Sequence, residues 1–195
     1  MAVLVTGGAG YIGSHMVWAL LDAGEDVVVF DRLSTGFDWA VAPEAKLVVG
    51  DVADKDLLMA TIRDNDVDAI IHFAGSIVVP ESVSDPLSYY ENNTSNSRTL
   101  IEAAVKTGVR HFIFSSTAAV YGTVGADPVT EDVPRNPDSP YGMSKLMTEI
   151  ILSDVAKAHE FYLGFLGFSV DWEHRFGENF PLYTQVSLGG LTLHL

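Results

Sequence analysis

Hydrophobic and polar positions along the first 160 residues form short apolar runs separated by longer stretches with helical periodicity. The apolar runs are rich in β-branched residues and nearly continuous, which is typical of strands buried on both faces of a parallel sheet. They predict strands at Val3–Thr6, Asp26–Phe30, Lys46–Val49, Ala69–Phe73 and His111–Ser115. The stretches between them predict helices at Gly13–Ala23, Lys55–Asn65, Ser88–Thr107 and from Tyr141 onward. This alternation predicts an α/β fold, a Rossmann-like doubly wound parallel sheet with right-handed crossovers.

The pattern changes after about residue 166. From Phe168 to Phe176 apolar and polar residues alternate with a period of two, which predicts a strand with one solvent-facing side. The segment Leu182–Val186 continues in the same style, and Gly189–Gly190 is a two-residue turn signal before Leu191–Leu195. The tail therefore predicts a C-terminal antiparallel β-meander.

Composition and charge narrow the classes of partner. The chain has 195 residues, of which 48% are hydrophobic, and a formal net charge of −15. This length can bury one sizeable core, and the acidic balance argues against nucleic acid or an anionic membrane as a partner. The absence of cysteine excludes disulfides, thiolate nucleophiles and cysteine-ligated zinc. We find no signal peptide and no apolar run of roughly 18 residues, and therefore expect a cytoplasmic protein.

A glycine-rich turn follows the first predicted strand and opens the first predicted helix. Gly7 permits the tight turn, Gly10 lets the backbone approach a pyrophosphate, and Gly13 allows close packing of helix and strand. Tyr11 and Ile12, which lie between these glycines, complete the predicted cofactor-binding turn. A glycine turn in this context predicts a dinucleotide-binding unit.

The end of the second predicted strand bears on which dinucleotide binds. Asp31 lies eighteen residues after Gly13, where a carboxylate accepts hydrogen bonds from ribose hydroxyls and repels a 2′-phosphate. This favours NAD over NADP. Arg32 leaves the alternative open, because an adjacent guanidinium can accommodate that phosphate.

A second constellation combines a tyrosine, a lysine and a hydroxyl group. Tyr141 and Lys145 have the i, i+4 spacing that places two side chains on one helix face. A nearby ammonium stabilises a phenolate, so a tyrosine in this pairing can act as a general base near neutral pH. Ser115, Ser116 and Thr117 follow the fifth predicted strand and add hydroxyl candidates. Without these hydroxyls and the glycine turn, the same spacing is more often found on an ordinary helix surface.

Seven segments between residue 2 and about residue 159 together carry a specific resemblance. They are VTGGAGYIGSH at 5–15, Asp31, Gly50–Val52, His72–Gly75, Tyr89–Asn93, Phe114–Gly122 and Ser139–Lys145. In these segments the chain resembles the extended short-chain dehydrogenase/reductases, and within them the UDP-glucose 4-epimerases. The resemblance implies NAD as cofactor, with hydride removed from C4 of a UDP-sugar and returned to its opposite face.

The resemblance also implies roles for individual residues. Those that would bind the cofactor beyond the glycine turn and Asp31 are Asp51 and Val52 at the adenine, Phe73, Ala74 and Gly75 along the groove, and Asn92. The implied catalytic residues are Thr117, Tyr141 as the base, and Lys145, which would orient the nicotinamide ribose. The resemblance thus implies that Tyr141 and Lys145 are both catalytic and cofactor-binding residues.

From about Asp154 the sequence resembles a different family. The segments Asp154–Phe168, Val170–Phe176 and Gly190–Leu195 resemble part of the βαβββ module of the glyoxalase/bleomycin-resistance (vicinal oxygen chelate) family. We interpret the chain as a hybrid: residues 1–153 form an NAD-binding Rossmann-like domain, and 154–195 a partial module sharing a helix with it. His174 and His194 lie near ligand positions of that family, but two histidines do not make a site, and we expect no metal.

Three functions remain open at this stage. The first is an NAD-dependent 4-epimerase with weak or no turnover, because the sugar-binding half of the family is not matched. The second is a non-catalytic recombined fold or a dimerising module, and we expect a homodimer because the apolar face of Phe168–Phe176 needs a partner. The third is a metal-dependent protein of the glyoxalase/bleomycin-resistance type. The expected ligands are NAD and, for the first function, a UDP-sugar.

Overall fold

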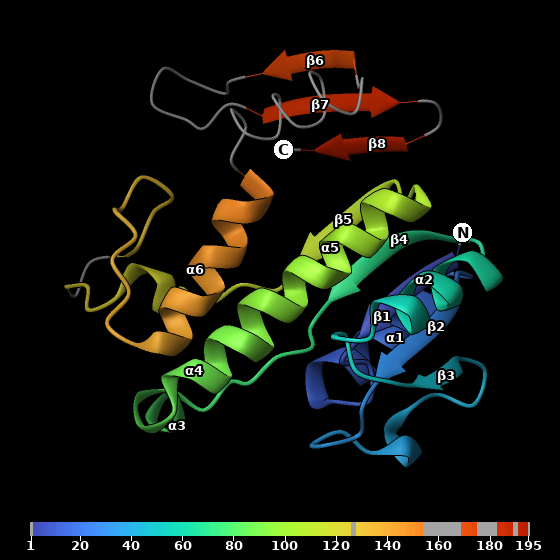
Figure 1. The fold of residues 1–195 in the computed structure, drawn as a ribbon, viewed down its shortest axis with the longest axis horizontal. Coiled ribbons are helices and arrows are strands. Elements are labelled where there is room, and N and C mark those ends of the chain that lie inside the picture. The colour runs from blue at the N-terminus through green and yellow to red at the C-terminus, as the bar shows by residue number, and fades with distance from the viewer. Residues whose placement is uncertain (1, 126–127, 154–168, 175–182, 189–190, 195) are drawn as a thin grey trace. The chain divides into compact units, whose positions relative to one another are not determined.

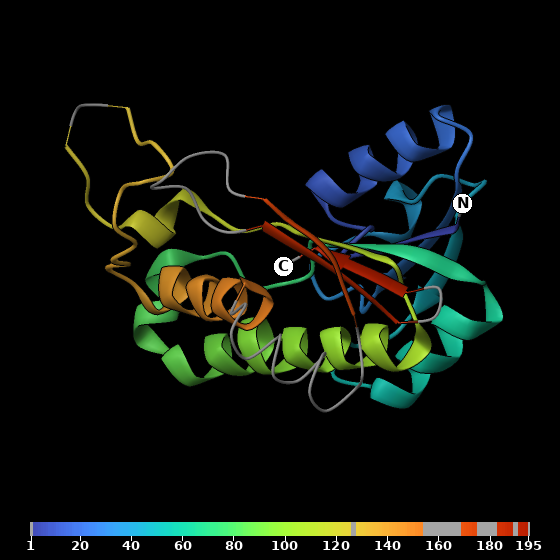
Figure 2. The ribbon, with the colours of Figure 1, turned by 90° about the horizontal axis from the view of Figure 1, so that it is seen from above.

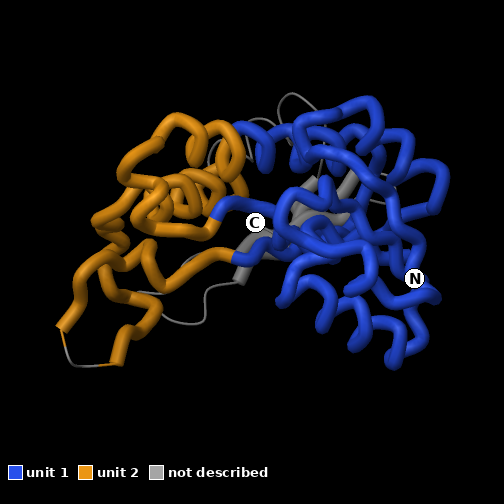
Figure 3. The backbone as a smooth tube through the Cα atoms, turned by 90° about the horizontal axis from the view of Figure 1, so that it is seen from below, with its two compact units in different colours: residues 1–76, 95–115 blue, residues 77–94, 116–195 orange. Residues whose placement is uncertain are grey.

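The computed structural model describes residues 2–125, 128–153, 169–174, 183–188 and 191–194 (Figure 1). The chain divides into two compact units (Figure 3). Unit 1 comprises residues 1–76 and 95–115, and unit 2 comprises residues 77–94 and 116–195. The predicted boundary near residue 153 adjoins residues 154–168, which lie outside the described ranges, and it remains a prediction.

Unit 1 contains a five-stranded parallel sheet. Its strands are β1 (Ala2–Thr6), β2 (Asp26–Asp31), β3 (Lys46–Val49), β4 (Val67–His72) and β5 (His111–Phe114). Their order is β3-β2-β1-β4-β5, and each neighbouring pair is parallel. The prediction of a Rossmann-like parallel sheet is therefore confirmed. The strand order reverses between β1 and β4, and sheets of this kind bind their ligands at such a switch point.

Two separate cores form because both faces of the sheet are apolar. The helices of unit 1 are α1 (Tyr11–Asp22), α2 (Lys55–Asp64) and α5 (Asn96–Thr107), with the short 3₁₀ turn η1 (Asp38–Ala40). Figure 2 shows α1 on one face and α2 and α5 on the other. Val5 of β1 packs with Val17 on the α1 side, whereas Leu4 packs with Leu58 and Leu100 on the opposite side. Successive strand residues alternate between the two cores.

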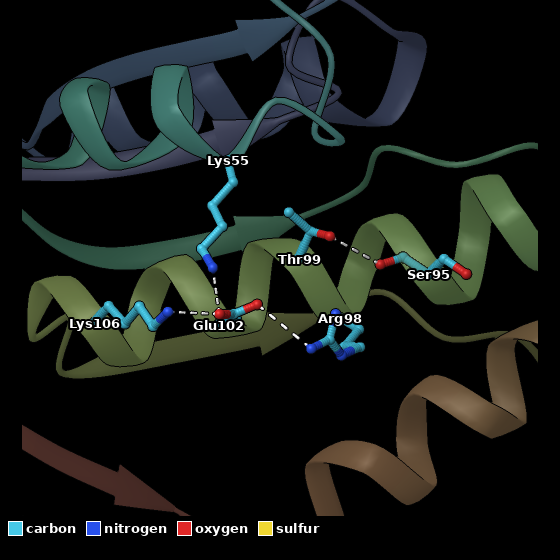
Figure 4. Close-up of polar contacts among 6 residues, drawn as sticks. All are labelled: Lys55, Ser95, Arg98, Thr99, Glu102 and Lys106. Carbon is cyan, nitrogen blue, oxygen red and sulfur yellow. Dashed lines mark hydrogen bonds and ion pairs between the residues drawn. The ribbon is translucent and has the colours of Figure 1, made fainter.

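An ion-pair network on the surface of unit 1 joins α2 to α5 (Figure 4). The Glu102 carboxylate accepts a hydrogen bond from Lys106 Nζ at 2.7 Å and another from Lys55, and Arg98 Nη2 lies 3.5 Å from it. The ammonium groups of Lys106 and Lys55 lower the pKa of Glu102 to about 2. Because these side chains are partly exposed, the network contributes about 1 kcal/mol or less per pair to stability.

Unit 2 begins with three successive helical segments, of which the sequence did not predict the first and did not separate the other two from α5. They are α3 (Val79–Ser84), α4 (Pro86–Tyr89) and the π-helix η2 (Tyr90–Ser95), which leads into α5. The single helix predicted over Ser88–Thr107 was wrong in this respect. The Asp85 carboxylate caps α4 by accepting a hydrogen bond from Ser88 N–H at 3.3 Å, and the helix then widens into the π-turn.

The other regular elements in the described part of unit 2 are a 3₁₀ turn, a longer helix and three short strands. The 3₁₀ turn η3 (Ala118–Tyr121) follows β5, and α6 (Pro140–Ser153) contains the predicted Tyr141 helix. Strands β6 (Ser169–His174), β7 (Tyr183–Leu188) and β8 (Leu191–His194) pair antiparallel in that order. The prediction that this helix continues past residue 153 and is shared with the C-terminal module, and the side chains of the tail, lie outside the described set. Among the described residues, we find no helix of sufficient length and apolarity to cross a bilayer.

Candidate functional site

The glycine turn of unit 1 packs directly against the end of the neighbouring strand β4. Gly7 has a φ of +72°, and a Cβ there would lie 2.7 Å from the amide nitrogen of Ala74. A Cβ on Gly13 would lie 2.1 Å from the carbonyl oxygen of Gly7. These distances leave no room for a side chain at either position. The structure therefore places the predicted turn beside Phe73 and Ala74, at the switch point between β1 and β4.

The first turn of α1 presents an uncapped helix N-terminus. Among the described residues, no side chain caps Gly10 and no acidic residue lies in the first turn. Tyr11 and Ile12 are mostly exposed, at 82% and 62%. A Cβ added to Gly10 would have its nearest contact, the Gly7 carbonyl oxygen, at 3.3 Å, so this glycine is open on its outer side. Backbone N–H groups in this arrangement, aided by the helix dipole, fit a pyrophosphate.

The Asp31 carboxylate is fastened to the glycine turn. Its Oδ2 accepts a hydrogen bond from Ala9 N–H at 3.0 Å, and its Oδ1 accepts one from Leu33 N–H at 2.8 Å. Leu33 takes up a left-handed backbone conformation, with φ of 58°, to bring its N–H to this carboxylate. Each carboxylate oxygen keeps a second lone pair, so Asp31 can still accept hydrogen bonds from ribose hydroxyls.

Asp51 and Val52 follow β3 as predicted, and Val52 is buried. Asp51 Oδ1 accepts a hydrogen bond from Ala53 N–H at 2.9 Å, and Oδ2 lies 3.0 Å from Arg32 Nη1. Burial opposes the ionisation of Asp51, but the Ala53 N–H and the Arg32 guanidinium outweigh it and lower its pKa. The carboxylate at this position is therefore fixed and charged at neutral pH.

The sequence analysis missed a chain of buried polar side chains next to the glycine turn. Oγ1 of Thr6 lies 2.6 Å from Nδ1 of His72, and Oγ of Ser97 lies 2.8 Å from Nε2 of the same ring. All three side chains are buried. This chain joins β1, β4 and α5 immediately before the turn and the Phe73 segment begin. The signal in the sequence was a histidine directly after the apolar run Ala69–Ile71.

In unit 2 a second buried polar network fixes helix α6 to the π-helix η2. Asn93 Nδ2 donates to Ser144 Oγ at 3.0 Å, and Thr94 Oγ1 donates to the Ser144 carbonyl at 3.0 Å. Thr148 Oγ1 donates to the Asn93 carbonyl at 3.1 Å. The sequence analysis named Asn92, which is half-buried, and missed the buried Asn93 beside it. The network fixes α6 on both sides of Lys145.

The first turn of α6 packs closely against the turn that carries Thr117. A Cβ on Gly142 would lie 2.5 Å from the carbonyl oxygen of Ala119 in η3. Thr117 caps η3, with Oγ1 accepting a hydrogen bond from Ala119 N–H at 3.2 Å, so its hydroxyl proton remains available for donation. The structure thus places the Thr117 turn against the start of α6, where Tyr141 lies.

The Tyr141 side chain is half-buried against a second tyrosine. The rings of Tyr89 and Tyr141 are nearly perpendicular, with centroids 6.4 Å apart. Tyr89 is buried, and its hydroxyl lies 2.7 Å from the Val78 carbonyl and 2.8 Å from Glu81 Oε2. Burial and the Glu81 carboxylate raise the pKa of Tyr89, so its phenol stays protonated. Tyr89 therefore acts as a fixed wall for the Tyr141 ring.

Lys145 lies one helical turn after Tyr141 and is only 4% exposed. Burial lowers its pKa to about 8 from the usual 10.5. The folded state thus releases the proton at a lower pH than the unfolded state does. The energetic cost of burying the ammonium is therefore fully present below pH 8 and is relieved as the pH rises toward 10.5.

Replacing Lys145 by methionine is accordingly expected to remove the rise in stability between pH 8 and pH 10.5 that the buried lysine produces. The wild type gains stability in that interval because its folded state releases the proton at a lower pH than its unfolded state. Urea unfolding of both proteins at pH 7 and pH 10 measures this difference. Lys46→Met, at an exposed position of β3, is the control and should keep the wild-type rise. The same rise from pH 7 to pH 10 in Lys145→Met and in the wild type would contradict the expectation.

Comparison with known proteins gives consistent matches over most of the chain. The model of the NAD dependent epimerase/dehydratase family matches residues 3–170. A UDP-glucose 4-epimerase of Azospirillum brasilense is 55% identical over 157 residues, which cover 80% of this chain and 45% of that protein. The enzyme of the same name from Lactobacillus helveticus is 48% identical over 158 residues, covering 81% of this chain and 48% of its own length.

Solved structures show the same similarity. UDP-glucose 4-epimerase from Brucella ovis in complex with NAD superposes with a TM-score of 0.77 at 43% identity, over 80% of this chain and 48% of that one. The enzyme from Bifidobacterium longum in complex with NAD⁺ and UDP gives 0.76 at 40% identity, over 81% and 50%. The chain thus spans about half the length of the relatives it matches.

Proposed function

The chain belongs to the NAD dependent epimerase/dehydratase family, and from this we propose that it is an NAD-binding protein carrying the proton-transfer residues of a UDP-sugar 4-epimerase. The observation that carries the proposal is the burial of Lys145 one helical turn after Tyr141. Lysine is almost never buried in a protein core without a reason, because desolvation penalises its charge. A lysine that must orient a ribose and stabilise a phenolate gives that reason.

The residues of unit 1 fit the nucleotide. The backbone of Gly7, Gly10, Tyr11, Ile12 and Gly13 would hold the pyrophosphate, and Asp31 would accept hydrogen bonds from the adenosine ribose. Asp51 and Val52 would lie at the adenine, with Phe73, Ala74 and Gly75 along the groove. Asn92, Tyr141 and Lys145 of unit 2 complete the proposed cofactor set. When bound, NAD⁺ supplies a hydride acceptor for the C4 position of the sugar.

The residues of unit 2 would move the proton. Tyr141 as the phenolate accepts the proton of the sugar 4-hydroxyl while the C4–H bond breaks, which leaves a 4-keto sugar. The Lys145 ammonium stabilises the phenolate, and the Thr117 hydroxyl donates a hydrogen bond to the sugar 4-oxygen. Return of the hydride to the opposite face and of the proton from Tyr141 inverts C4 and restores the protein.

Turnover by this chain is proposed to be weak or absent. Remote binding of the UDP group would position the sugar, and such positioning contributes many orders of magnitude in effective concentration. The chain spans about half the length of its relatives, so a large part of that binding would have to come from elsewhere.

Two measurements test the proposal. The purified protein is denatured, and the supernatant is examined for the ultraviolet absorbance of released NAD; protein lacking it is titrated with NADH. UDP-galactose is then incubated with the protein, and UDP-glucose is quantified by chromatography. We expect bound NAD and a slow or absent conversion. A well-folded sample that neither contains nor binds the nucleotide would overturn the proposal. Rapid conversion of UDP-galactose would overturn the part that proposes weak or absent turnover.

The other two functions rest on residues 154–195 and remain predictions. The family model already matches up to residue 170, which favours the epimerase-like interpretation over the vicinal oxygen chelate module for the start of this segment. His174 and His194 end β6 and β8, and their side chains lie outside the described set. Light scattering for the homodimer and a chelator test for the metal-dependent activity distinguish these alternatives.

A further inference from the structure

The Arg32 guanidinium, which left the choice between NAD and NADP open in the sequence, is held on two sides. Its Nε donates to Ser34 Oγ at 3.0 Å, and its Nη1 donates to Asp51 Oδ2 at 3.0 Å. Arg32 directly follows β2 and Asp51 lies shortly after β3, so the ion pair connects the carboxyl ends of two adjacent strands.

The Asp51 carboxylate is itself held in place. Its second oxygen accepts the Ala53 N–H at 2.9 Å, and the preceding Gly50 N–H donates to the Asp31 carbonyl at 3.0 Å. The carboxylate is ionised, and it therefore competes for the guanidinium throughout the neutral range. The ion-pair partner of Arg32 is thus itself hydrogen-bonded to the backbone.

A free arginine at this position would have a different role. Asp31 lies where an acidic side chain accepts ribose hydroxyls, and an arginine next to that carboxylate is the group that accommodates the 2′-phosphate of NADP. In this chain the guanidinium is turned toward Asp51 and Ser34.

We propose that Asp51 is a specificity-determining residue that pairs with Arg32, withholds the guanidinium from a 2′-phosphate, and so makes unit 1 select NAD over NADP. This inference rests on the proposed nucleotide site. The effect has two parts. An exposed ion pair shifts an equilibrium by no more than about fivefold, and the negative charge of Asp51 adds repulsion of a dianionic phosphate, which salt screens.

The test measures dissociation constants for NADH and NADPH by nicotinamide fluorescence on the full chain freed of bound nucleotide. Replacing Asp51 by asparagine is expected to narrow the preference for NADH by about five- to tenfold at low salt. The ratio of the two constants is the readout, because any loss of adenine binding affects both nucleotides equally. Asp51→Ser, which keeps an acceptor for the Ala53 N–H, is the second variant in case the first folds poorly.

Arg32→Gln completes a double-mutant cycle with Asp51→Asn. Alone, this substitution should leave the ratio of the NADH and NADPH dissociation constants within about twofold of the wild type. In the double variant with Asp51→Asn, it should abolish the gain in relative NADPH affinity that Asp51→Asn gives. Asp68→Asn is the matched control, since it breaks the comparable pair with Arg110, which precedes β5, and should leave the ratio unchanged.

An unchanged ratio in both Asp51 variants would overturn the inference. So would a weakening of NADPH by Arg32→Gln alone, because Arg32 would then already serve the phosphate. In either case NADH binding by the wild type supports the nucleotide-binding part of the proposed function. Wild-type protein that binds neither nucleotide overturns both.

Discussion

Replacing Tyr141 by phenylalanine is expected to lower the interconversion of UDP-galactose and UDP-glucose by about 10²–10⁴-fold while NAD remains bound. The substitution removes the phenolic oxygen that accepts the sugar proton and keeps the ring that packs against Tyr89. Because turnover by this chain is proposed to be slow, the rate is measured in single turnover with the protein in excess over labelled UDP-galactose. Urea unfolding should show little change in stability.

Tyr90→Phe is the matched control for this experiment. Tyr90 is a half-buried tyrosine of the same unit, in the π-helix η2, and it has no proposed role in proton transfer. Its rate should remain within about twofold of the wild type. If Tyr141→Phe retains its rate within tenfold, another group accepts the proton and the assigned mechanism is wrong.

Two glycine substitutions are expected to distinguish a role in packing the glycine turn from a role in binding the nucleotide. An alanine Cβ at position 13 would lie 2.1 Å from the Gly7 carbonyl oxygen and 2.8 Å from Gly8 Cα, so rigid backbone must move. Gly13→Ala should therefore destabilise the protein by about 1–3 kcal/mol or more and lower NAD affinity with it. At position 10 the nearest atom is 3.3 Å away, so Gly10→Ala should cost about 1 kcal/mol or less.

The affinity for NADH then distinguishes the two roles. Gly10→Ala places a methyl group where the backbone would approach the pyrophosphate, and we expect at least a tenfold loss of affinity in a stable protein. Urea unfolding and fluorescence titration measure the two quantities. Gly24→Ala, at the far end of α1, is the control: a Cβ there meets no described atom within 4 Å, although its φ of +80° carries some strain. Wild-type affinity in Gly10→Ala would show that the pyrophosphate does not bind at this turn.

The sequence was sufficient for the sheet because its determinants are local. Runs such as Val27–Phe30 are apolar at every position, and burial on both faces of a parallel sheet requires that pattern. The glycine turn was equally predictable, because Gly7 and Gly13 lie in contacts that admit no Cβ. The i, i+4 spacing predicted Tyr141 and Lys145 on one helix, and the structure shows both in α6.

The contacts that position these residues are made by partners distant in the chain. The pattern of hydrophobic and polar residues could not predict such contacts. The π-turn of η2 exists in a stretch whose periodicity is helical, and Asn93 in it pairs with Ser144, fifty-one residues later. The burial of Lys145 depends on packing in unit 2. Arg32 has an acidic partner, Asp51, that is nineteen residues away and was assigned only to the adenine.

The interleaving of the two units has a consequence for synthesis on the ribosome. Strand β4 pairs with β5 through Ala69 and His111, and the first segment of unit 2, residues 77–94, is made between them. At about 5–20 residues per second, β5 emerges several seconds after its partner. During that interval the nascent sheet ends at an open β4 edge of apolar residues, which can pair with another chain.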